Sequence, residues 1–102
     1  MNPSTKGDTM SGASYELIEK GIKVERQKPI SVLYKKISLD CGYRIDLLVE
    51  KQFIIELKSI DVFSHIHTSQ ILTYMRFAHI KTGLLINFNT TVLKNGIKRF
   101  VL

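Results

Sequence analysis

The chain has 102 residues, 44% of them hydrophobic and 24% charged, which is the composition of one globular domain. Its apolar runs are too short for a transmembrane helix, its polar N-terminus lacks the apolar core of a secretory signal, and its single cysteine excludes a disulfide framework and favours a reducing, cytoplasmic location. A net charge of +6 fits a polyanionic partner, with nucleic acid first and a membrane surface second.

The first third of the chain contains three segments that differ in composition and in the spacing of their apolar residues. Residues 1–12 are small and polar and are expected to be a disordered leader, so that a single domain covers residues 13–102. Ala13–Lys20 has helical composition and is followed by a glycine suited to a helix C-terminus. Apolar residues at alternate positions over residues 22–34, interrupted by Pro29, predict an edge strand or a bulged strand.

The rest of the chain alternates strand and helix patterns. A short strand, Ile37–Leu39, is followed by a turn signal at residues 40–42. The further predicted elements are strands Tyr43–Val49 and Phe53–Lys58, a helix Ser64–His79 with Ser64 as its N-cap, a buried strand Gly83–Phe88, and a final strand or short helix over residues 97–102. This order predicts a layered α/β or α+β domain.

Two carboxylates and an ammonium group share one face of the hairpin formed by the two strong strands. Because side chains alternate along a strand, Asp46 falls on the same face as Glu56 and Lys58. The opposite face is expected to face the core and holds Tyr43, Ile45, Leu47, Val49, Phe53, Ile55 and Leu57. A three-residue turn pairs Val49 with Phe53. The same register sets Asp46 directly opposite Glu56, with Cβ atoms about 4.5–5.5 Å apart.

Opposed carboxylates destabilise a sheet, so this pair requires a compensating cation. Lys58 alone would make a structural ion-pair cluster on the solvated face of the hairpin. A hard divalent ion such as magnesium, which binds carboxylate and carbonyl oxygens, would instead make a metal site. The charge pattern by itself leaves both alternatives open.

The spacing of these residues resembles a known motif. An Asp on one strand followed by Glu-x-Lys on the next, here Asp46 with Glu56 and Lys58, is similar to the core motif of the PD-(D/E)XK nuclease superfamily. Gln70 and Tyr74 match the Q-x-x-x-Y pattern of its RecB-like members. The amino-acid sequence from about residue 13 to 102 resembles a bacterial and archaeal branch, the GxxExxY family. The resemblance lies in the stretches YELIEKGIKVERQKPI, GYRIDLLVEKQFIIELK and QILTYMRFAHIKTGLLINFNTTVLKNGIKRFVL.

This resemblance implies a restriction-endonuclease-like core, in which helices flank a central mixed sheet. It implies that Asp46 and Glu56 bind magnesium, or manganese in its place, with the backbone carbonyl of Leu57 as a further ligand. Lys58 would orient or activate the attacking water. Gln70 and Tyr74 would line the site beside them. The implied activity is hydrolysis of DNA phosphodiester bonds, with DNA and not a membrane as the partner.

The chain departs from the GxxExxY family in one respect. No glycine is followed three residues later by glutamate, so the first helix is expected to be truncated and to lack its acidic residue. An alternative function follows, that of a catalytically impaired nuclease-fold module that binds nucleic acid or a protein partner. A truncated first helix would also expose apolar sheet surface and favour a homodimer.

Overall fold

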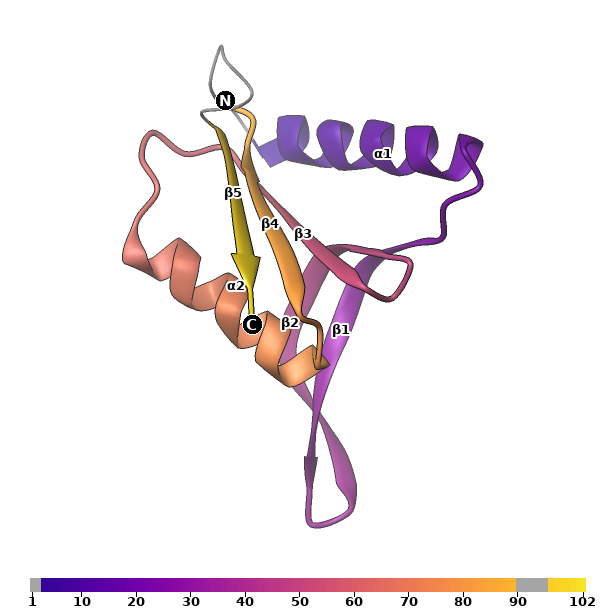
Figure 1. Cartoon of the computed structure of the whole chain (residues 1–102), viewed down its shortest axis with the longest axis vertical. Coiled ribbons are helices and arrows are strands. Elements are labelled where there is room, and N and C mark those ends of the chain that lie inside the picture. Colours follow the sequence, from indigo (N-terminus) through magenta and orange to yellow (C-terminus); the bar gives the residue numbers. More distant parts are fainter. Residues whose placement is uncertain (1–2, 90–95) are drawn as a thin grey trace.

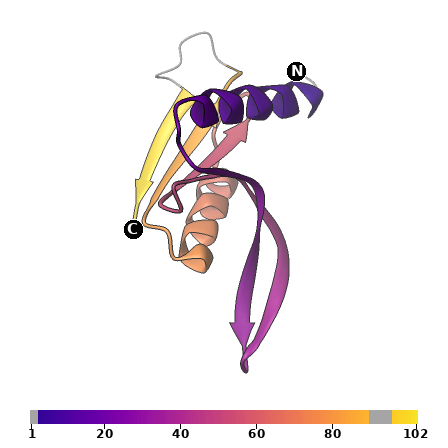
Figure 2. The ribbon, with the colours of Figure 1, turned by 90° about the vertical axis from the view of Figure 1, so that its right-hand side faces the viewer.

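The protein is built from a five-stranded mixed sheet with one helix on each side (Figures 1 and 2). The structure is a computed structural model, and it describes residues 3–89 and 96–102. In chain order the elements are α1 (Pro3–Glu19), β1 (Val24–Tyr34), β2 (Ile37–Val49), β3 (Phe53–Lys58), α2 (His65–Ala78), β4 (Thr82–Asn87) and β5 (Ile97–Val101). The strands lie in the order β1-β2-β3-β4-β5, with β3 and β4 parallel and the other neighbours antiparallel. α2 makes the crossover that the parallel pair requires. The predicted α+β fold is confirmed.

The N-terminal helix is longer than the sequence pattern predicts. The disordered leader predicted for residues 1–12 is wrong over most of its length, because α1 begins at Pro3; residues 1–2 lie outside the described part of the chain. Met10 is buried and packs with Leu47 and Leu57 of the sheet. This packing stabilises a helix whose composition alone would not hold it. A domain boundary at residue 13 would fall inside α1, and it stays a prediction.

α1 covers the side of the sheet that a truncated first helix would leave bare. It contacts β1, β2 and β3, and Ala13 packs against the same apolar cluster as Met10. The homodimer prediction therefore loses the exposed surface on which it was based, and the oligomeric state stays a prediction. Among the described residues, neither helix has the length and apolarity needed to cross a membrane.

α2 packs closely on the opposite side of the sheet. Ile71 and Met75 are fully buried there, in a cluster with Ile54 of β3 and Leu85 of β4. Gly83 of β4 makes the close approach possible: a Cβ atom at this position would lie 2.9 Å from the Met75 sulfur and 3.0 Å from Cδ1 of Ile71. The prediction of a helix capped by Ser64 is confirmed, and His67 completes a capping box with it.

The two faces of the central hairpin do not divide as the alternating pattern predicts. Ile45 belongs to the cluster under α2, whereas Leu47, two residues later, belongs to the cluster under α1. Leu48 and Ile54, which strict alternation places on the same face as Asp46 and Glu56, are also buried. The alternation is interrupted at Asp46, and helices cover both sides of the sheet instead of one.

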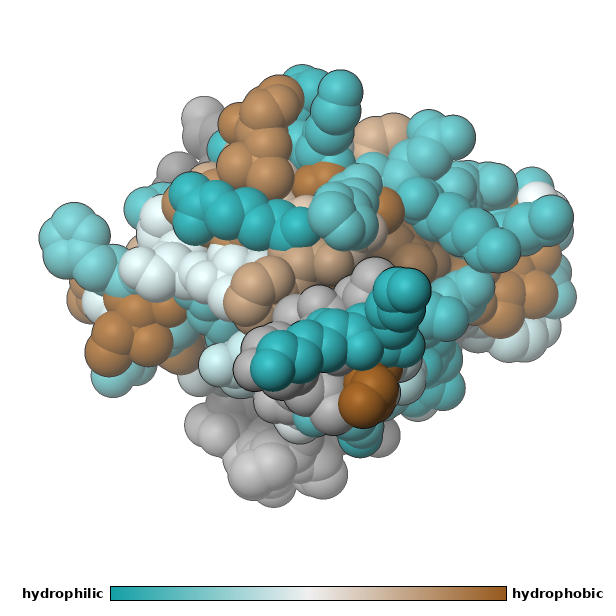
Figure 3. Space-filling model, turned by 90° about the horizontal axis from the view of Figure 1, so that it is seen from below, coloured by the Kyte–Doolittle hydropathy of each residue, from teal (hydrophilic) through white to brown (hydrophobic). Residues whose placement is uncertain are grey.

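β1 and β2 continue beyond the rest of the sheet as a projecting hairpin (Figures 1 and 2). β2 runs without interruption through residues 40–42, where the sequence predicts a turn. In place of a turn, the pairing of β2 with the edge strand β1 shifts its register between Pro29 and Ser31. At the tip, Lys35 and Lys36 both have positive φ, as a two-residue hairpin turn requires. Seen from this end, hydrophilic and hydrophobic residues are interspersed over the surface (Figure 3).

Gly83→Val is expected to lower the free energy of unfolding by about 1–3 kcal/mol, because the added atoms would overlap with Met75 and Ile71. Urea denaturation followed by circular dichroism measures this change. Gly12→Ala is the control: it lies within α1 with open space around it, and alanine there should raise the stability by about 0.5–1 kcal/mol. Equal urea midpoints for Gly83→Val and the wild type would contradict the close packing of α2.

Candidate active site

The strands β2 and β3 exchange side-chain hydrogen bonds where their ladder ends. The ladder stops at Leu47 and Ile55, so Asp46 and Glu56 are the next opposed positions, as the predicted three-residue turn requires. The backbone N–H of Asp46 donates to Oε1 of Glu56 over 3.0 Å. In return, the backbone N–H of Leu57 donates to Oδ2 of Asp46 over 2.8 Å. Each carboxylate is thus anchored to the backbone of the opposite strand.

Both carboxylates are buried, contrary to the solvated face considered for a structural ion-pair cluster. Asp46 is 4% exposed and Glu56 is 2% exposed, since α1 and α2 cover the two sides of the sheet. Neighbouring carboxylates removed from water repel each other strongly, and hydrogen bonds from backbone amides offset only part of that cost. A site with this arrangement favours a cation among the carboxylate oxygens.

A chain of polar side chains leads from the end of β3 to α2. The Lys58 ammonium donates to Oε1 of Gln70, and Nε2 of Gln70 donates to the Tyr74 hydroxyl over 3.0 Å. Because an ammonium group can only donate, it fixes the orientation of the Gln70 amide. Gln70 and Tyr74 are four residues apart and therefore lie on one face of α2.

Tyr74 joins this chain to the carboxylates. Its pKa is raised above the ordinary value, first by burial of the hydroxyl and next by the negative charge of Glu56, with a smaller effect from Asp46. The phenol therefore stays protonated at neutral pH. Since its oxygen accepts from Gln70, its hydrogen can be donated to a bound anion. The five predicted site residues are thus brought together at one place.

Two further residues support the site, and the sequence pattern does not single them out. The buried amide of Asn87, at the end of β4, accepts from the backbone N–H of Ile60 (3.1 Å) and donates to its carbonyl (2.8 Å). These bonds hold the connection that follows Lys58, whose register partner is Asn87. The pattern indicated only the end of a strand here, because the loop that Asn87 binds is remote in sequence.

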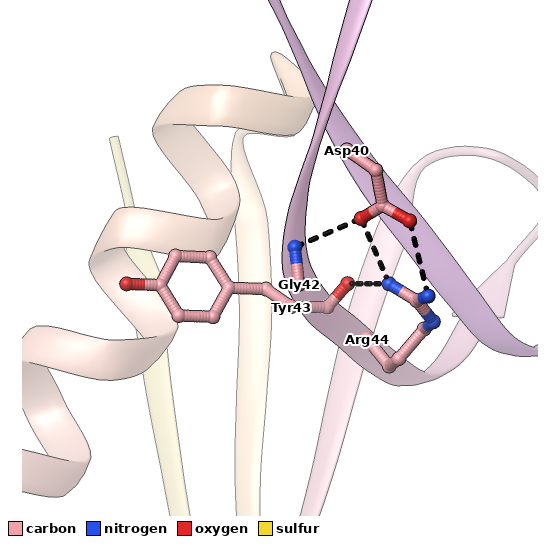
Figure 4. A network of polar contacts seen from close by, with 4 residues as sticks. All are labelled: Asp40, Gly42, Tyr43 and Arg44. Atoms are coloured by element: carbon pink, nitrogen blue, oxygen red, sulfur yellow. Dashed lines mark hydrogen bonds and ion pairs between the residues drawn. The ribbon is translucent and has the colours of Figure 1, made fainter.

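Tyr43 is the second residue missed. It was expected in the core, yet it is 43% exposed and its ring centre lies 5.4 Å from that of Tyr74. The bulge that places it is held by Asp40, which accepts from the Gly42 N–H and from both terminal nitrogens of Arg44 (Figure 4). The Arg44 hydrogen bonds, followed by that of Gly42, lower the pKa of Asp40 below its ordinary value.

The donor set at the carboxylate pair fits a hard divalent ion. Residues 3–89 and 96–102 contain no group of three or more His, Cys, Asp or Glu side chains placed to hold a metal. An ion bound to Asp46 and Glu56 would therefore complete its shell with backbone carbonyl, water or substrate oxygens. Magnesium commonly binds in this way, through one or two carboxylates and several waters. A carboxylate that accepts a hydrogen bond from a backbone N–H on one oxygen still has further lone pairs for coordination of a metal ion.

Comparison with known proteins agrees with this geometry. The family model described as the PD-(D/E)XK nuclease superfamily matches residues 11–100, which is nearly the whole chain and a range that contains the five predicted site residues. Nucleases of this superfamily generally use divalent metal ions. No curated protein and no solved structure matches the chain. The extent of the match and the fold together establish that the chain belongs to the PD-(D/E)XK nuclease superfamily.

Proposed function

We propose that the protein is a magnesium-dependent nuclease that hydrolyses DNA phosphodiester bonds. The observation that supports this most is the buried pair of Asp46 and Glu56 next to Lys58, Gln70 and Tyr74 in a member of a nuclease superfamily. The net charge of +6 is consistent with a polyanionic substrate. The finer assignment to the GxxExxY branch is part of the proposal and is supported by the resemblance of the three sequence stretches quoted above.

Asp46 and Glu56 would hold the metal, with the carbonyl of Leu57 as a further ligand and manganese able to take the same oxygens. When bound, a divalent ion lowers the pKa of a coordinated water and offsets negative charge on the phosphate. The hydrogen bonds from the backbone amides of Asp46 and Leu57 keep both carboxylates in place before any ligand arrives. Such preorganisation avoids the cost of ordering the site during the reaction.

Lys58 supplies the positive charge at the reacting phosphate. Its ammonium would orient the attacking water and stabilise the charge that grows on the phosphate oxygens. Gln70 acts as a positioning residue because it fixes the direction of that ammonium. Tyr74, which stays protonated at neutral pH, can donate its hydroxyl hydrogen to a phosphate oxygen.

A second candidate function is a catalytically impaired module that binds nucleic acid or a protein partner. It is favoured by the absence of a Gly-x-x-Glu-x-x-Tyr sequence and by the position of the α1 glutamates, since Glu16 and Glu19 are both exposed. Under this alternative the fold and the basic surface remain, but the two carboxylates do not bind a metal tightly enough for catalysis.

Lys58→Ala is expected to leave the fold intact and to reduce magnesium-dependent DNA cleavage about 100-fold or more, because the reacting phosphate loses the positive charge of the Lys58 ammonium. Cleavage of labelled single-stranded and duplex DNA, with RNA in parallel, measures the effect. Lys20→Ala, which changes an exposed lysine directly after α1, is the matched control and should cleave like the wild type. The nuclease proposal fails if the wild type cleaves none of these substrates with magnesium or manganese.

Asp46→Asn is expected to abolish magnesium binding while preserving the fold, since asparagine keeps an oxygen that can accept from the Leu57 amide but loses the charge. Isothermal titration of magnesium into each protein tests this. Asp61→Asn removes an exposed carboxylate outside the pair and should leave the affinity unchanged. Identical titrations for the wild type and Asp46→Asn would support the impaired module instead.

A further inference from the structure

A hollow on the surface adjoins the site and is not used by the proposed hydrolysis. Its volume is about 260 Å³, and it is lined by Tyr43, Ile66, Ser69, Gln70, Thr73 and Tyr74. Gln70 and Tyr74 belong both to this hollow and to the polar chain that starts at Lys58. A group bound in the hollow would therefore be directly next to a phosphate held at Lys58 and the carboxylates.

The lining combines apolar surface with hydrogen-bonding groups. Tyr43 presents a partly exposed aromatic ring, and Ile66 is 78% exposed at the start of α2. Ser69, Thr73 and the Gln70 amide supply hydroxyl and amide groups around them. The volume is smaller than the pockets that hold drug-sized ligands, and it suits one small planar group. A flat face with polar edges is the chemistry of a nucleobase, which stacks on aromatic side chains.

The backbone around Tyr43 is held firmly, although this part of β2 is exposed. Gly42 has φ +78°, and its N–H donates to Oδ1 of Asp40 over 2.8 Å. Arg44 binds both oxygens of Asp40, at 3.0 and 3.1 Å, and also donates to the carbonyl of Tyr43 (Figure 4). The bulge thus directs the Tyr43 ring toward α2, and little ordering is left to occur when a ligand stacks on it.

We propose that Tyr43 and this hollow bind one unpaired nucleobase of the nucleic-acid substrate, beside the phosphate to be cut. The inference rests on the proposed function and deepens it by naming the substrate class. In an uninterrupted duplex each base is stacked and paired, so it cannot enter the hollow without first being flipped out. Single-stranded segments, flaps and overhangs are therefore the preferred substrates.

Binding of an oligonucleotide that carries one 2-aminopurine tests this proposal in a buffer with EDTA, so that no cleavage occurs. With the single strand, the wild type should quench the 2-aminopurine fluorescence, and Tyr43→Phe should do the same because it keeps the ring. Tyr43→Ala should remove the quenching and weaken single-strand binding about 10-fold. Its affinity for a blunt duplex of the same sequence should not change. Tyr15→Ala, which removes an exposed tyrosine on α1, is the matched control.

Ile66→Ala provides a second variant, since a side chain that is 78% exposed can be shortened without loss of the fold. It should weaken single-strand binding in the same direction as Tyr43→Ala. The proposal is overturned if the wild type causes no quenching and binds single strand and duplex equally, or if both variants bind the single strand like the wild type. Because these readouts need neither metal nor catalysis, an inactive wild-type protein would contradict the nuclease proposal alone.

Discussion

The structure depends on two like charges that the sheet buries side by side. Asp46 and Glu56 interrupt the hydrogen-bond ladder of β2 and β3, and each takes a backbone N–H of the opposite strand in place of a ladder bond. This exchange fixes the positions of both side chains through the backbone itself. It does not by itself remove their mutual repulsion, which calls for a compensating positive charge. Under the proposed function, a divalent ion held by the pair offsets this repulsion together with the Lys58 ammonium.

The other elements act on the surroundings of this pair. α1 and α2 exclude water from its two sides, and the close approach of α2 over Gly83 brings Gln70 and Tyr74 to the end of β3. Parallel pairing with β4 then places Asn87 beside Lys58, where it holds the following loop. The site is therefore assembled from strand ends and one helix face, and it needs no long loop of its own.

Much of the site could be predicted because strand and helix periodicity act locally. Alternation and a short turn were sufficient to oppose Asp46 and Glu56, and a four-residue spacing aligned Gln70 with Tyr74. Burial of the pair was not predictable, because it results from packing of both helices on the sheet. The same long-range packing accounts for the early start of α1. The ambiguous end at residues 97–102 became β5 through its pairing with β4, a contact that local sequence does not contain.

The most direct test compares the stability of the wild type and Glu56→Gln, with and without magnesium. Glutamine keeps an acceptor oxygen for the Asp46 amide but removes one of the two buried charges. In EDTA, Glu56→Gln should be more stable than the wild type by about 0.5–2 kcal/mol, as expected when a functional site costs stability. Magnesium should then raise the urea midpoint of the wild type alone. A wild type that is more stable than Glu56→Gln in EDTA and unaffected by magnesium would contradict this account.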